Sequence, residues 1–392
     1  MNDHHMGPPD QKDGEDIITE VDSSATSPAQ RTRKTGYLDV LIQGVALFSD
    51  GYNIQVVGYM LTVLAKLYPE ETTTDVRTRL SNSILIGDIF GMLIFGYCID
   101  RFGKKLGVIL TMMAFGEFVL ELESYEIANK ESQLPLTIFL FRMRLLDSTQ
   151  YEKHAIQHKI PYKLALKYYW TQLVGTCTAW FLYDVIIYPF NLLAPTLTIG
   201  WSALIDSFAL PGAFIGALLM DRIGRKQTYV LGWSIAAVLG FIIGGAMFKL
   251  QHIFPLFVVL YGLMQTFLAV GPGDCNFLVA SESFPTPLRG HFLGFAAAVG
   301  KAGAAVGTSA LTPVVSAFET QMEGQRTLFL IGSAISVVGT LVVWFMIPSH
   351  PDSLDDEDVK FRKYLEDNGY DTSRMGLKSE QDNEISVIGA TK

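Results

Sequence analysis

The feature that constrains this chain most is a series of long apolar blocks separated by polar stretches that hold Lys and Arg. A helix needs about 20 apolar residues to cross the roughly 30 Å hydrocarbon core of a bilayer. Blocks of that length lie at residues 37–65, 80–100, 172–194, 199–220, 228–248, 253–281, 290–318 and 326–347. They are apolar on every side, whereas helices of a soluble core show a stripe at helical period. The pattern therefore predicts an all-α integral membrane protein.

The polar ends of the chain look like tails. Residues 1–36 and 349–392 are polar and acidic, and we expect the acidic run Asp355–Asp358 to be solvated rather than a metal site. The three cysteines lie inside apolar blocks, which offers neither a disulfide framework nor a zinc spacing. We expect no metal, no cofactor and no nucleic-acid partner, and the apolar blocks make the lipid bilayer an expected partner.

The cations predict the orientation, because Lys and Arg accumulate in short cytoplasmic loops. Cationic clusters lie at residues 31–34, 101–105, 147–170 and 222–226. They share one side of the membrane if two shorter blocks, 106–120 and 134–146, both cross it or both do not. Both termini are then cytoplasmic.

A ten-residue motif occurs twice, each time between two apolar spans. GYCIDRFGKK at residues 96–105 recurs as ALLMDRIGRK at residues 217–226. The small residue lets helices approach, the Asp can meet cations or a helix N-terminus, and the later Gly permits a tight turn. The candidate gating residues are Gly96, Asp100, Arg101, Gly103 and Lys104 in the first copy, and Asp221, Arg222, Gly224 and Arg225 in the second.

The repeated motif resembles the loop motif of the major facilitator superfamily, whose members carry it after the second helix of each six-helix half. The resemblance implies a complete six-helix bundle at residues 171–348 and an incomplete bundle at 37–146, joined by a basic loop at 147–170. Between Asp100 and Asp221 the family should place six helices, but only two full blocks and two short ones occur there. We infer that the start of a third helix is joined to the end of a sixth. Splicing, an error in the gene model and a real truncation all remain possible causes.

Functional residues are expected among the ionisable groups inside the spans. Each costs about 2.5 to 3.5 kcal/mol at the bilayer centre and is seldom there without a partner or a task. Asp50 lies midway along the first block. Trp180, Asp184 and Tyr188 are spaced by four, so all three line one face of a helix. Lys301 lies about 18 Å along its span, too deep to reach the interface comfortably.

A further candidate comes from GPGD at residues 271–274, which interrupts the block 253–281. Broken helices at membrane depth are tolerated where they line a polar cavity, and this makes Asp274 a candidate cavity residue. Asp88 and Asp206 also fall within spans. We assign these two by default to structural hydrogen bonding or to span ends.

Simpler explanations stand beside the functional ones. Trp180 and Tyr188 can be interfacial or packing residues, and the Gly-rich run around Lys301 can serve close helix packing. Lys301 with Asp50 and Asp184 can form a structural ion pair between helices. A carrier accounts for them better, since a buried ammonium can meet an anion while desolvated carboxylates can take and release protons.

These residues resemble the phosphate:proton symporters of the superfamily. The strings GTCTAWFLYD, GPGD, SESFPTPLRG and GKAGAAVGT resemble more closely the fungal glycerophosphoinositol permeases. The resemblance implies that Lys301, Trp180 and Tyr188 contact the anion and that Asp50 and Asp184 take part in proton coupling. Asp274 stands where the phosphate symporters usually have an asparagine, and a carboxylate there could accept hydrogen bonds from a polyol hydroxyl.

Two functional hypotheses follow. The first is a proton-coupled symporter of glycerophosphodiesters, inorganic phosphate or both, with sugar or carboxylate carriage left open because a fold does not determine its substrate. The second is a remnant that does not transport, or an interaction partner of an intact carrier. No motif of an enzyme supports a catalytic function.

Overall fold

The computed structural model describes residues 67–68, 70, 73–102, 154–156, 160–193, 199–349, 354–373 and 375–376. All of them belong to one compact unit, Ile54–Lys392. The first apolar block with Asp50, the motif residues Gly103 and Lys104, and the two short blocks with the junction between them lie outside the described residues.

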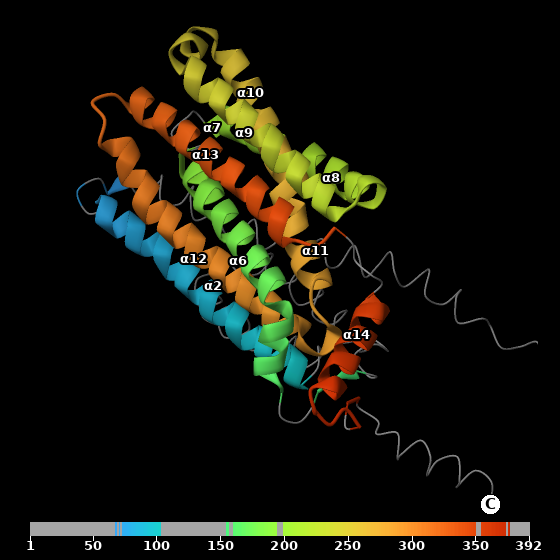
Figure 1. Cartoon of the computed structure of the whole chain (residues 1–392). Coiled ribbons are helices and arrows are strands. Elements are labelled where there is room, and N and C mark those ends of the chain that lie inside the picture. The colour runs from blue at the N-terminus through green and yellow to red at the C-terminus, as the bar shows by residue number, and fades with distance from the viewer. Residues whose placement is uncertain are drawn as a thin grey trace, which may run out of the picture. The chain divides into compact units, whose positions relative to one another are not determined.

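The described part of the chain is built of helices (Figure 1). The α-helices are α2 (Thr74–Phe102), α6 (Tyr162–Leu193), α7 (Ile199–Ser207), α8 (Ala209–Ile223), α9 (Arg225–Leu250), α10 (Phe254–Leu268), α11 (Asp274–Glu282), α12 (Arg289–Ser316), α13 (Gln321–Met346) and α14 (Leu354–Asp367). Short turns η2 (Gln251–Ile253), η3 (Ala269–Gly273) and η4 (Thr286–Leu288) join some of them.

Five segments of the described residues are long and apolar enough to cross a membrane. They are Tyr162–Phe190, Leu204–Ile223, Arg225–Glu282, Thr286–Val315 and Gln321–Met346. The third is 58 residues long, and at 1.5 Å per residue this is far more than one crossing of a core roughly 30 Å thick. It contains α9, α10 and α11 and supplies two crossings. The predicted all-α membrane fold is confirmed, and every apolar block expected between residues 172 and 347 is helical.

The predicted interruption at GPGD is also present. Helix α10 passes into the π-helical turn η3, and α11 then starts at Asp274. Pro272 lies inside this turn and has no backbone N–H to donate, which is one reason a regular α-helix does not continue here. The irregular backbone is buried in protein: Gly271 packs against Gly232 of α9 so closely that a Cβ on either residue would clash with the other's backbone.

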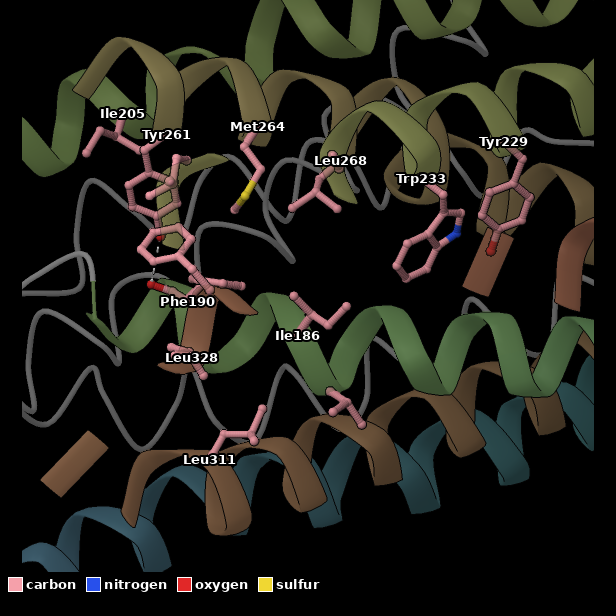
Figure 2. Close-up of a cluster of buried hydrophobic side chains, with 14 of the residues drawn as sticks. Ile186, Phe190, Ile205, Tyr229, Trp233, Tyr261, Met264, Leu268, Leu311 and Leu328 are labelled. Carbon is pink, nitrogen blue, oxygen red and sulfur yellow. Dashed lines mark hydrogen bonds between the residues drawn. The ribbon is translucent and has the colours of Figure 1, made fainter. Parts of the chain in front are cut away.

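A large hydrophobic cluster joins the helices of the second half. Figure 2 shows side chains of α6 pointing toward those of α9 and α10, with Leu311 of α12 and Leu328 of α13 nearby. Trp233 of α9 is a fully buried member of this cluster. The hydroxyl of Tyr261 donates to the backbone carbonyl of Phe190 at 3.3 Å, so the polar end of a buried ring is satisfied.

Helix α12 packs along both α2 and α6 (Figure 1). Small residues make both contacts possible. A Cβ at Gly294 would clash with the α2 backbone, and a Cβ at Gly303 or Gly307 would clash with the α6 backbone. The glycines around Lys301 therefore serve close helix packing, which was the simpler explanation of this Gly-rich run.

The acidic segment after α13 differs from the expectation of a solvated tail. Residues Leu354–Asp367 form α14, which covers the start of α6 and the turn before α12. Asp358 is 2% exposed and accepts hydrogen bonds from the Thr286 backbone N–H at 2.6 Å and the Thr286 hydroxyl at 2.5 Å. The prediction that the acidic run is solvated is wrong for Asp358, because η4 offers donors that a carboxylate can satisfy.

Contact with α14 also explains why α6 begins earlier than the apolar block at residues 172–194 predicts. The helix starts at Tyr162, so the end of the expected 147–170 loop is helical. Tyr169 and Ala165 in these first turns are fully buried. The Tyr169 hydroxyl donates to Glu357 of α14 at 2.6 Å, and Phe361 of α14 lies in the same hydrophobic cluster as its ring. Packing against α14 thus supports the first turns of α6, which precede the apolar block expected at residues 172–194.

Candidate functional site

Lys301 is the centre of the candidate site. It lies near the middle of α12 and is 8% exposed. Its ammonium donates a hydrogen bond to the Tyr188 hydroxyl at 2.5 Å and lies 5.1 Å from the centre of the Tyr188 ring. The oxygen and the ring face of one α6 tyrosine thus both stabilise the positive charge.

Asp184 lies one turn before Tyr188 on α6 and belongs to the same group. It is 3% exposed and interacts electrostatically with Lys301 and Asp88. Its Oδ2 atom is buried and has no hydrogen-bond partner among the described residues. A buried carboxyl oxygen in this state is costly unless it is protonated or binds a ligand or water.

Asp88 is a member of the site that sequence reasoning missed. Its Oδ2 lies 3.9 Å from the Lys301 ammonium, whereas the sequence alone predicts only structural hydrogen bonding or a span end for this residue. A usable signal was present, because Asp88 falls at the middle of α2. Lys301 is also near the middle of its helix, and two opposite charges at similar depth are natural partners.

Trp180 has mainly a packing role in this structure. Its ring packs edge-to-face on Phe277 of α11 with centroids 4.6 Å apart, and a Cβ on Gly300 would clash with the indole. Trp180, Asp184 and Tyr188 nonetheless share the side of α6 that meets α12 and α11, as their spacing predicts. A substrate contact by Trp180 stays a prediction.

Asp274 is placed apart from Lys301. Its Oδ2 lies directly over Gly216 of α8, where it is buried and has no hydrogen-bond partner among the described residues. Asp274 and Lys301, both described, form no ion pair or hydrogen bond with each other. The structure therefore brings together Lys301, Tyr188, Asp184 and Asp88, while the binding role of Asp274 stays a prediction.

The first copy of the repeated motif holds the start of α12. Asp100 at the end of α2 accepts hydrogen bonds from the backbone N–H groups of Gly290 and His291 at 2.9 and 2.7 Å. It also lies 2.5 Å from the His291 ring Nδ1. A carboxylate at this position satisfies N–H groups that have no partner inside the helix and interacts favourably with the helix dipole. Gly96, one turn earlier, allows the close approach to Gly290.

The second copy makes a different set of contacts. Arg225 forms a two-pronged ion pair with Glu282 at 3.1 and 3.3 Å, and it lies 3.6 Å from Asp221. The Asp221 side chain is 79% exposed, in contrast to the buried Asp100. Gly224 has φ of +94°, the conformation that favours glycine in the tight turn between α8 and α9.

The comparison with known families agrees with this architecture. Residues 40–119 and 157–351 match the model of the sugar (and other) transporter family, which covers well over half of the chain. The chain belongs to this family of the major facilitator superfamily. It is therefore a transporter by family, and the resemblance stated from its motifs is confirmed.

Named relatives of the chain include transporters of phosphate-bearing anions. Glycerophosphoinositol permease 1 of Candida albicans is 31% identical over 455 residues, which cover 91% of this chain and 86% of the relative. Glycerophosphoinositol transporter 1 of Saccharomyces cerevisiae is 29% identical, with 93% and 89% covered. An inorganic phosphate transporter of Toxoplasma gondii is 27% identical over 199 residues, 47% of this chain and 34% of the relative.

The same comparisons bear on the missing helices. The alignment with the Candida permease runs over 455 residues, although this chain has only 392. The relative must therefore contain residues to which nothing in this chain corresponds. The family match is interrupted between residues 119 and 157, which includes the junction where the deletion was inferred.

Proposed function

We propose that this chain is a proton-coupled symporter of glycerophosphodiesters, inorganic phosphate or both. The observation that carries the proposal is Lys301, a buried ammonium near the middle of α12 with Tyr188 and two carboxyl groups around it. Such a group is costly at membrane depth, and an anion-binding task accounts for it. The names of the relatives support the substrate class, since they include glycerophosphoinositol and inorganic phosphate.

The proposed roles follow from charge. The ammonium of Lys301 attracts the phosphate group and can donate to its oxygens. The Tyr188 hydroxyl, whose oxygen accepts from Lys301, can donate its own proton to another phosphate oxygen. An ionised Asp184 beside them would repel the same anion, so binding favours its protonated form. Anion and proton then enter the site together, and this is the physical basis of symport.

Other residues have supporting roles in the proposal. Asp50 is a second proton-coupling residue, while Trp180 and Asp274 contact the organic part of the substrate. The two copies of the motif gate the cytoplasmic side. We place the protein in the plasma membrane because it would import an outside nutrient, and both termini in the cytoplasm on the distribution of its cations.

Uptake in a transport-deficient yeast tests this function. Cells expressing the chain at the surface should accumulate labelled glycerophosphoinositol or labelled phosphate, and collapsing the proton gradient should stop it. Unlabelled sugars and dicarboxylates should not compete. Surface expression with no uptake of either anion contradicts the proposal, and competition by a sugar or a dicarboxylate would change the substrate class.

The second hypothesis is a chain that cannot transport, and the shortened first half favours it. Alternating access rocks one half of such a carrier against the other, so a half without several helices should fail to close the path. A chimera that receives the corresponding helices of the Candida permease between residues 119 and 157 separates the two. Uptake by the chimera alone supports the remnant, whereas equal uptake by the natural chain contradicts it. Sequencing the transcript across this interval shows whether cells also make a longer form.

A further inference from the structure

Asp88 and Lys301 face each other because α2 and α12 pack in one antiparallel register. Asp100 contacts the backbone at Gly290 and His291, and Gly96 packs on Gly290 and Gly294. Continuing this register along the two helices brings Asp88 opposite Lys301. Close backbone contacts and a helix cap thus hold the pair in position, independently of the attraction between the two charges.

The two partners of the ammonium bind it differently. Tyr188 is at hydrogen-bond distance, 2.5 Å, whereas the Asp88 carboxylate is at 3.9 Å. The second distance lies beyond the usual range of about 2.7 to 3.2 Å for an N–H···O bond. An ammonium has three donors, and Tyr188 accepts from one of them. Asp88 therefore contributes its charge to Lys301 without a hydrogen bond.

Asp88 is also the more accessible partner. Its side chain is 28% exposed, whereas that of Lys301 is 10% exposed. The Asp88 side chain is therefore less tightly enclosed by protein than Lys301, and of the two groups it is the one that a bound anion can displace. Asp184 is more deeply buried and lies on the α6 side of the same ammonium.

We propose that Asp88 is a built-in competitor of the transported anion: it compensates the charge of Lys301 between transport events, and the anion takes its place on binding. The inference rests on the proposed function. In it, the transported anion and the Asp88 carboxylate on α2, in the first half of the protein, compete for Lys301. This competition makes Asp88 a positioning and affinity-setting residue, since the binding energy of the anion must cover the displacement of a resident charge.

The test is direct binding of anions to the purified full chain in detergent. Inorganic phosphate and glycerophosphoinositol are titrated separately by calorimetry into the wild type, Asp88→Asn and Asp88→Glu. Asp88→Asn removes the competing charge and should lower the Kd about tenfold. Asp88→Glu retains a carboxylate and should stay within about twofold of the wild type.

A matched control comes from the same helix. Asp75→Asn removes a carboxylate about 20 Å away along α2 and should leave the Kd unchanged. If Asp88→Asn does not yield folded protein, Asp88→Ser serves for the same titration. A thermal melt without anion distinguishes a purely structural role, which would lower the Tm of Asp88→Asn and leave the Kd as it was.

The outcomes separate this inference from the proposed function. An unchanged or weaker Kd in Asp88→Asn, with a wild type that binds, overturns the competitor role and leaves the transport function standing. Tighter binding by Asp88→Asn than by a wild type that binds but transports nothing supports the competitor role while contradicting the transport function of the natural chain. Absence of binding in every variant overturns both.

Discussion

Lys301 and Asp184 have different environments although they belong to one group of side chains. The ammonium has a hydrogen bond to Tyr188 and a nearby carboxylate, so its charge is compensated. Asp184 has a buried oxygen without a hydrogen-bond partner among the described residues. We expect a stable charge on the first residue and an exchangeable proton on the second.

This difference predicts separable effects of two substitutions. In a counterpart with all twelve helices, Lys301→Ala should abolish anion binding, because no other cation contacts Tyr188 or Asp184 among the residues described. Asp184→Asn, which resembles the protonated acid, should keep binding and lose the dependence of uptake on pH. Binding by calorimetry and uptake from pH 5 to 8 measure the two effects. Equal loss of both functions in both variants would contradict the division of roles.

Helix α14 shows how a charged segment becomes part of a membrane protein's structure. Its acidic residues do not point into water uniformly: Glu357 and Asp358 bind Tyr169 and Thr286, and Phe361 enters a buried cluster. The helix thereby ties the start of α6 to the turn that precedes α12, the helix that carries Lys301.

The docking of α14 depends on Asp358 more than on the acidity of the helix. Asp358→Asn removes the charge and replaces one acceptor oxygen by a donor, which leaves the Thr286 hydroxyl poorly satisfied at a cost of about 1 to 3 kcal/mol. We expect faster cleavage by trypsin at Lys360 and Lys363 and a lower Tm. Asp367→Asn makes the same change at an exposed position in the last turn of α14 and should behave like the wild type. Equal cleavage of both variants would show that the apolar contacts alone hold the helix.

In the whole molecule, contacts between the segments that precede α6 and follow α14 limit how many times the chain can cross the membrane between them. The Gly376 N–H donates to the Ala155 carbonyl at 2.8 Å, and Ile156 pairs with Met375. Segments on either side of the second half thus meet at one side of the membrane, which requires an even number of crossings between them. Six crossings, from α6 through α13, satisfy this requirement.

The orientation of this arrangement can be tested with an epitope tag. Because the basic residues before α6 favour the cytoplasm, a tag after Lys392 should react with antibody only in permeabilised cells. A tag placed in the turn between α12 and α13, at Glu319, lies at the opposite side and should react in intact cells. Labelling of the C-terminal tag in intact cells would reverse the predicted orientation.

Local sequence is enough to predict the membrane class, the spans of the second half, the irregular turn at GPGD and the repeated motif, and through the motif the family. These properties depend on local composition, since the length of an apolar block and the lack of a donor on Pro272 act wherever the segment lies. Lys301 and the shared face of Asp184 and Tyr188 were also predictable, because depth in a helix and a spacing of four follow from helical geometry.

Which charged and polar groups meet depends on how the helices pack. Asp88 became a partner of Lys301 through the register of α2 on α12, Asp358 became buried through the donors of η4, and Asp274 came to face Gly216 of α8 rather than Lys301. The physical reason is the same in all three cases. The cost of a buried charge depends on the donors, acceptors and counter-charges supplied by another helix, and a single segment of sequence contains no information on which helix that will be.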